Sequence, residues 1–122
     1  MGEYILIAGS RNFTNEKRLA EILEKEVGAD DIIVEGGATG VDSMAREWAE
    51  ARGIAVIEIR ADWKKYGRAA GPKRNDAMTA YIAEHGGLAV FIWDGKSKGT
   101  KQCIDSAMKR MIPIIIYMEA ET

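Results

Sequence analysis

Two short segments of the chain combine glycines, hydroxyl side chains and the start of a predicted helix, which is a combination that binds anions. One reads GGATGVD over residues 36–42, and the other reads DGKSKGTK over residues 94–101. Glycine lets backbone N–H groups approach a bound group closely, and the helix N-terminus adds partial positive charge. Each segment is therefore predicted to bind a phosphate or a carboxylate. The alternative that stays open is that the glycines, with Thr39 or Thr100, only form turns and helix caps.

Neither segment matches a standard nucleotide fingerprint. GGATG lacks the spacing G-x-G-x-x-G, and no part of the chain reads G-x-x-x-x-G-K-[ST]. The sequence therefore contains neither the Walker A motif nor the common dinucleotide motif.

A third segment, residues 60–76, is long and basic. From Arg60 to Arg74 it holds six basic residues against one acid, Asp62, with Trp63 and Tyr66 interleaved. We expect a strand-to-helix loop of 17 residues, a length more typical of binding loops than of plain connections. The alternative is a solvated charged surface, but the local charge in an acidic protein favours an anion site with aromatic stacking for a base.

Three other side chains that could do chemistry are assigned structural roles. His85 precedes two glycines at a predicted helix end, which favours a capping interaction over catalysis. Cys103 lies one turn into a predicted helix, where a packed thiol is favoured over a nucleophile. Trp48 belongs to the apolar stripe of another predicted helix.

The elements that must position these segments are apolar runs of strand length, separated by helical patterns. The runs are 4–8, 32–34, 55–59, 88–93 and 112–118, and several are continuous, which is typical of strands buried on both faces of a parallel sheet. This order predicts a single domain over residues 1–122 with a doubly wound α/β fold, in which five parallel strands have helices on both faces.

In such a sheet every strand-to-helix connection leaves the same carboxyl edge, where ligands bind. The four connections of this kind are 9–14, 35–42, 60–76 and 94–101, and the opposite connections are short and plain. The glycine-rich and basic segments are therefore predicted to meet at one edge.

Composition bounds the class of protein. Of 122 residues, 47% are hydrophobic and 30% charged, and the formal net charge is −2, so any affinity for anions must be local. The single cysteine excludes an internal disulfide and a Cys-rich metal site, and no metal or cofactor is predicted. No leader sequence precedes the first apolar run, and no run approaches the ~20 residues that span a bilayer. We expect a soluble cytoplasmic protein without membrane association.

The chain resembles the SLOG superfamily of Rossmann-like proteins, which bind nucleotides or nucleotide-derived ligands. More closely it resembles the small stand-alone branch described as YspA-like, or YpsA-related. The resemblance rests on four segments, IAGSRNF, EGGATGVDSMA, ADWKKYGRAAGPKRNDAM and WDGKSKGTKQCIDSAM, which cover nearly the whole chain. GGATGVD also resembles the phosphate loop of the DNA-processing protein A family, which binds single-stranded DNA. The superfamily implies a homodimer as well.

A more distant resemblance is to the cytokinin-activating phosphoribohydrolases, which cleave the N-glycosidic bond of nucleoside monophosphates. The family's Arg-Lys-x-x-Met segment is matched at Arg74 and Met78, and its Pro-Gly-Gly-x-Gly-Thr-x-x-Glu motif only at Gly99 and Thr100. The glutamate position is Cys103 here, and a thiol does not replace a carboxylate beside an oxocarbenium-like transition state. The resemblance therefore implies the ligand class more directly than the reaction.

We accordingly predict a nucleotide-like ligand at the carboxyl edge of the sheet. Backbone groups of the two glycine-rich segments would hold phosphates, Arg74 would pair with a phosphate, and Asp42 or Asp94 would accept a hydrogen bond from ribose. Hydrolysis of a glycosidic or phosphate bond is the first alternative, and binding of single-stranded nucleic acid is the second and less favoured one. The predicted ligand-binding residues are Gly9, Ser10, Arg11, Phe13, Gly36, Gly37, Thr39, Gly40, Asp42, Trp63, Tyr66, Arg74, Asn75, Asp94, Ser97, Gly99 and Thr100.

Overall fold

A computed structural model describes residues 2–119 of the chain. Its centre is a sheet of five parallel strands in the order β3-β2-β1-β4-β5, so the central strand β1 has β2 and β4 as neighbours. The strands are β1 (Tyr4–Gly9), β2 (Ile32–Glu35), β3 (Ala55–Glu58), β4 (Gly87–Trp93) and β5 (Ile114–Met118). Each predicted apolar run is a strand, with small differences at the ends.

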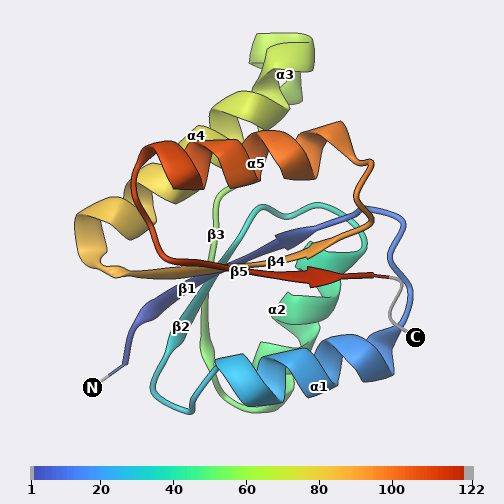
Figure 1. Cartoon of the computed structure of the whole chain (residues 1–122), viewed down its shortest axis with the longest axis vertical. Coiled ribbons are helices and arrows are strands. Elements are labelled where there is room, and N and C mark those ends of the chain that lie inside the picture. The colour runs from blue at the N-terminus through green and yellow to red at the C-terminus, as the bar shows by residue number, and fades with distance from the viewer. Residues whose placement is uncertain (1, 120–122) are drawn as a thin grey trace.

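The helices form a layer on each face of the sheet. Helices α1 (Glu16–Glu26) and α2 (Val41–Ala51) cover one face, and α4 (Ala70–His85) and α5 (Lys98–Lys109) cover the other (Figure 1). The short helix α3 (Trp63–Tyr66) and the 3-10 turn η1 (Gly67–Ala69) project beyond α4 and α5, away from the sheet (Figure 1). The predicted doubly wound α/β fold of Rossmann type is confirmed.

Two hydrophobic cores follow from the alternation of side chains along buried strands. Ile5 and Ile7 of β1 face α1 and α2, whereas Leu6 and Ala8 face α4 and α5. Both faces of the central strands are therefore apolar, which explains the continuous hydrophobic runs in the sequence. Within residues 2–119 no helix is long and apolar enough to cross a membrane.

The segment 60–76 is largely helical, and the prediction of a 17-residue loop was wrong. Helix α3 begins because the Asp62 side chain accepts a hydrogen bond from the N–H of Lys65 at 3.1 Å. Gly67, at φ 54°, then ends that turn, and α4 begins at Ala70 with Pro72 in its first turn. Helix α3 buries none of its residues, so no apolar stripe marked it in the sequence.

The other end of α4 agrees with the structural role predicted for His85. The Nδ1–H of His85 donates to the carbonyl oxygen of Tyr81 at 2.9 Å, and the two rings stack with centroids 4.0 Å apart. Gly86 follows at φ 86° as the C-cap. His85 thus closes the helix at the edge opposite the strand-to-helix connections.

Phe91 of β4 gives a test of this packing, because its side chain has no exposed area in the core under α4 and α5. Phe91→Ala is expected to lower the free energy of unfolding by about 3–5 kcal/mol through lost burial and a residual cavity. Met111→Ala, at a side chain that is 90% exposed, is the control and should change it by less than about 0.5 kcal/mol. Urea denaturation measures both, and equal effects would contradict the core described above.

Candidate functional site

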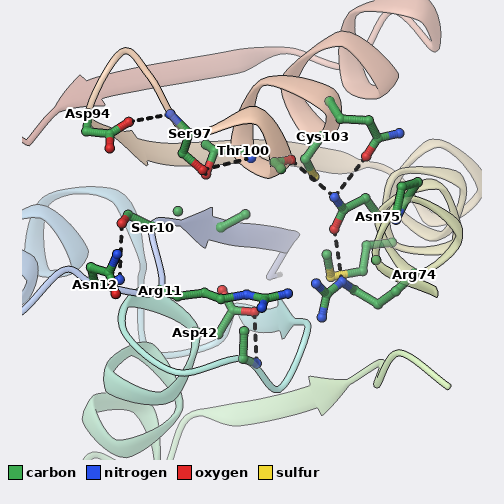
Figure 2. A pocket seen from close by; sticks show the side chains of 18 of the residues that line it. Ser10, Arg11, Asn12, Asp42, Arg74, Asn75, Asp94, Ser97, Thr100 and Cys103 are labelled. Atoms are coloured by element: carbon green, nitrogen blue, oxygen red, sulfur yellow. Dashed lines mark hydrogen bonds between the residues drawn. The ribbon is translucent and has the colours of Figure 1, made fainter. Parts of the chain in front are cut away.

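A cavity of about 500 Å³ lies at the carboxyl edge of the sheet. Its wall is made by the β1–α1 connection, the start of α2, helix α4 and the β4–α5 connection, which converge from separate parts of the chain (Figure 2). The expected meeting of several connections at one edge is therefore observed. The sequence-predicted residues that line this cavity are Gly9, Ser10, Arg11, Asp42, Trp63, Arg74, Asn75, Asp94, Ser97, Gly99 and Thr100.

A second cavity of about 270 Å³ adjoins the first. It is lined by Gly36, Gly37 and Thr39 of the glycine-rich segment and by Arg60 and Ala61 beyond β3. Four residues line both cavities, namely Arg11, Ala38, Trp63 and Arg74.

Phe13, Tyr66 and Gly40 line neither cavity. Phe13, predicted to bind the ligand, is 6% exposed and packs in the core beneath α1 and α2. Tyr66 is exposed on α3, and the ammonium groups of Lys65 and Lys73 lie against its ring. The projection of α3 away from the sheet explains the position of Tyr66.

Gly40 has a structural role at the start of α2. Its φ of 74° and ψ of −126° are a conformation that only glycine adopts readily, and it is the N-cap of the helix. The N–H of Val41, which follows it, donates to the carbonyl oxygen of Ser10 at 3.2 Å. Gly40 therefore lets the chain turn into α2 while α2 is joined to the β1–α1 connection.

The amides of the segment GGATGVD are held largely by the protein's own carboxylates. Asp42 Oδ2 accepts hydrogen bonds from the N–H groups of Gly36, at 3.0 Å, and Ala38, at 3.3 Å. Glu35 Oε1 accepts from the N–H of Gly37 at 2.6 Å. The expectation that Gly36 and Gly37 offer free amides to a phosphate is thus corrected, because Asp42 and Glu35 already occupy them.

The segment DGKSKGTK is braced in a similar way. Asp94 Oδ1 accepts from the N–H groups of Lys96 and Ser97 at 2.8 and 2.7 Å, and these bonds lower the pKa of Asp94. Ser97 caps α5 by accepting from the N–H of Thr100 at 3.4 Å. The N–H groups of Lys98 and Gly99, which precede Thr100 in the first turn of α5, have no acceptor within the helix.

Arg74 is held in place by two hydrogen bonds. Its Nη1 donates to the carbonyl oxygen of Gly36 at 2.6 Å, and its Nε donates to Asn75 Oδ1 at 2.9 Å. A Cβ at position 36 would lie 2.7 Å from Arg74 Nη1, so glycine is required there for the guanidinium to approach. The guanidinium of Arg11 points toward that of Arg74 (Figure 2), and it also lies 5.3 Å from the ring of Trp63.

A network of polar side chains between α4 and α5 holds Asn75, which accepts a hydrogen bond from Arg74. Asn75 Nδ2 donates to Gln102 Oε1 at 2.9 Å and to the carbonyl oxygen of Gly99 at 3.3 Å. Gln102 in turn donates to Asp76 Oδ1 at 3.3 Å. The orientation of the guanidinium is therefore set by packing between two helices.

Gln102 also lines the main cavity, together with Asn12 and Lys96, and sequence reasoning missed all three. The available signal for Gln102 was its position three residues after Gly99 on the same helix, a spacing that places two residues on one face. Nothing else in the sequence indicated a function for the Gln102 side chain.

Burial raises the pKa of two titratable groups that line the cavity, Asp42 and Cys103. Burial raises the pKa of Asp42 to about 6, although the nearby guanidinium groups of Arg74 and Arg11 lower it. Burial also raises the pKa of the Cys103 thiol to about 12. Cys103 is 1% exposed in the core under α5, so the prediction of a packed thiol is confirmed, although this residue also borders the cavity.

Glu35 is a functional feature that the sequence did not reveal, because a glutamate at the end of a strand is usually exposed. Its side chain has no exposed area, and burial, together with a hydrogen bond to the Glu58 carboxylate, raises its pKa to about 8. The pKa of Glu58 is lowered by that hydrogen bond and by Arg60. Glu35 is therefore protonated at neutral pH and lies directly beneath the glycine-rich segment.

This geometry defines the class of protein, a Rossmann-like α/β domain with an arginine-lined cavity at the switch point between β1 and β4. A family model described as the YspA, cpYpsA-related SLOG family matches residues 4–66, just over half of the chain. The chain belongs to this family, as its sequence motifs indicated. The Gene 61 protein of Mycobacterium phage D29 is 32% identical over 121 residues, which cover 93% of this chain and 94% of that protein.

The fold is also similar to that of a solved structure, DNA processing protein A from Streptococcus pneumoniae. The TM-score is 0.71 at 16% sequence identity, and the match covers 93% of this chain and 50% of the other. The chain therefore spans half the length of that protein. At this identity the likeness concerns the fold alone.

The buried carboxyl of Glu35 predicts a pH dependence of stability. In the unfolded chain Glu35 ionises near 4.5, whereas in the folded protein it keeps its proton up to about pH 8. The unfolded state releases this proton first, so the free energy of unfolding is expected to fall as the pH rises from about 5 to about 8 and then to level off. Glu35→Gln, which mimics the protonated carboxyl, should flatten this slope above pH 6, where Asp42 contributes little more.

Urea denaturation at a series of pH values measures this effect. Glu47→Gln makes the same substitution at a solvated position on the exposed side of α2 and is the control. An equal slope in the wild type and in Glu35→Gln would show that the carboxyl is not kept protonated by the fold.

Proposed function

We propose that this protein binds a nucleotide or a nucleotide-derived ligand in the cavity at the carboxyl edge of its sheet. The observation that carries the proposal is the convergence of the Arg11 and Arg74 guanidinium groups on a cavity of about 500 Å³ (Figure 2). Asp42 lies close enough to both guanidinium groups for them to lower its pKa, so its carboxylate offsets at most one of the two positive charges. Two cations that point toward each other and keep an excess of positive charge are suited to bind an anion.

The proposal assigns the following roles to individual residues. Arg11 and Arg74 hold the phosphate, and the first-turn amides of α5 add donors for its remaining oxygens. Trp63, which is 49% exposed at the mouth of the cavity, offers its ring to a base. Asp42 and Asp94 brace the two glycine-rich segments, so they contribute to binding by holding the backbone in place.

Hydrolysis of the ligand is supported less well. The residue at the catalytic glutamate position of the phosphoribohydrolases is Cys103, a buried thiol with a pKa of about 12. Asp42 and Asp94, the carboxylates of the cavity, are each engaged by two backbone N–H groups, which ties them to the two glycine-rich segments. These observations favour a binding module over an enzyme.

Binding of single-stranded nucleic acid remains a second candidate, because the fold is similar to that of a protein whose name states DNA processing. Basic side chains at the edge of the main cavity, including Lys96, would contact the backbone of such a strand. This function requires a steep loss of oligonucleotide affinity with increasing salt, in proportion to the phosphates neutralised. A mononucleotide ligand requires only a shallow loss.

Arg74→Ala tests the main proposal. It is expected to weaken the binding of nucleoside monophosphates by about 2 kcal/mol, or roughly thirtyfold, because a charge-assisted hydrogen bond is lost. Isothermal titration calorimetry with a panel of nucleoside monophosphates gives the dissociation constants. Analysis of the same mixtures for free base or released phosphate distinguishes binding from hydrolysis.

Arg68→Ala is the matched control, because Arg68 is exposed on η1 and lines neither cavity. It removes the same charge and should leave affinity unchanged. Equal affinities of the wild type and Arg74→Ala would remove Arg74 from the site, and a panel without any bound nucleotide would refute the proposed function.

We also propose that two copies associate, as the resemblance to the superfamily implies. The edge strand β5 supports this, because it exposes 41% of Ile116 and 42% of Met118 beside an unpaired strand edge. Ile116→Lys is expected to convert a dimer to a monomer in analytical ultracentrifugation. A wild-type protein that sediments as a monomer at high concentration would contradict this proposal.

A further inference from the structure

The two cavities meet at a junction where positive charge is concentrated. Arg11, Arg74 and the ring of Trp63 belong to the walls of both cavities. The guanidinium groups of Arg11 and Arg74 point toward one another at this junction (Figure 2). An anion bound between these two guanidinium groups would therefore lie at the boundary of the two cavities, with one cavity on each side of it.

This position has a chemical consequence for a phosphate bound there. A terminal phosphate has one substituent and needs space on one side only, whereas a bridging phosphate carries a group on each side. The cavities of about 500 and 270 Å³ provide two such spaces. The arrangement therefore fits a phosphate that joins two groups better than one that ends a molecule.

The charges at the junction agree with a bridging phosphate. Arg11 and Arg74 contribute two positive charges, and the buried carboxyl of Asp42 contributes at most one negative charge. Arg60, at the far wall of the second cavity, pairs with Glu58 at 2.5 Å, so this pair adds no net charge. The remaining balance of about one positive charge matches the single negative charge of a phosphodiester, whereas a phosphomonoester carries about two at pH 7.

The second cavity has the surface of a binding subsite. Gly36 and Gly37 line it, and the hydroxyl of the exposed Thr39 donates to the carbonyl oxygen of Arg11 at 3.3 Å, which leaves its lone pairs to accept from a ligand. The Arg60 side chain is 71% exposed and uses its Nε for Glu58, which leaves the other N–H groups of the guanidinium for a ligand. Ala61, which has a small side chain, also lines this cavity. These groups suit the sugar hydroxyls and the base of a second nucleoside.

We propose that the ligand consists of two nucleoside-sized groups joined through phosphate, with the linkage at the junction of Arg11 and Arg74 and the second group in the cavity lined by Thr39 and Arg60. This inference rests on the proposed function, because it places a nucleotide in the main cavity. A 3′,5′-phosphodiester and a 5′,5′-pyrophosphate both join two nucleosides through phosphate. The pyrophosphate carries two negative charges, so the charge balance at the junction favours the phosphodiester. The experiment below distinguishes these two linkages.

Calorimetry with three adenosine ligands tests the proposal: AMP, the 3′,5′-linked dinucleoside monophosphate ApA, and P1,P2-di(adenosine-5′) pyrophosphate. The same three uridine ligands control for the base. At least one linked ligand is expected to bind tenfold or more tightly than its monophosphate. The linked ligand that binds more tightly than AMP shows whether the site takes a 3′,5′-phosphodiester or a 5′,5′-pyrophosphate.

Arg60→Ala locates the second group. It should remove most of the advantage of the linked ligand and leave monophosphate affinity unchanged, and Arg68→Ala should change neither. Thermal unfolding of both variants checks the fold. The proposal is overturned if both linked ligands bind no more tightly than the monophosphates, or if Arg60→Ala weakens all ligands equally. In either case monophosphate binding that depends on Arg74 leaves the proposed function standing, whereas the absence of all binding overturns both.

Discussion

The arrangement of the site depends on the contact between the Arg74 guanidinium and the carbonyl oxygen of Gly36, at 2.6 Å. This bond joins a helix on one face of the sheet to the connection that leads to a helix on the other face. It is possible only because position 36 has no side chain, since a Cβ there would overlap the guanidinium. The Arg74 guanidinium also donates to Asn75 Oδ1, and the Asn75 amide in turn donates to Gln102 of α5. One cation thereby fixes the relative positions of three chain segments around the cavity.

A second constraint concerns the backbone amides of the glycine-rich segment. Buried amides need acceptors, and in this protein two buried carboxyl groups supply them. Burial raises the pKa of both Glu35 and Asp42, which shows that these groups are retained against the cost of desolvation. The amides of Gly36, Gly37 and Ala38 are thus already hydrogen-bonded. In the function we propose, the arginine side chains and the start of α5 therefore bind the anion, and the two adjoining spaces select the shape of the ligand.

Much of the fold could be predicted from the sequence because strands buried on both faces leave continuous apolar runs, and helices on a sheet leave apolar stripes. The family was also evident in the motifs, because they occur in the same order along nearly the whole chain. Helix α3 was missed because it buries no residue and therefore has no apolar stripe. Phe13 was misassigned for a related reason, since an aromatic residue in a connection gives no sign of which face of the sheet it will pack against.

The sequence by itself determined the parallel α/β sheet, the edge at which the polar connections gather and the residue types available there, because periodicity and chain order dictate them. Only the tertiary structure decided which amides remain free, because the acceptors of Gly36 and Gly37 are side chains whose positions depend on how β2 and α2 pack. It also decided that Arg11 and Arg74, which are far apart in the chain, face one another. Hydrogen bonds and charge pairs depend on distances of a few ångströms between segments, and no local pattern in a sequence records those distances.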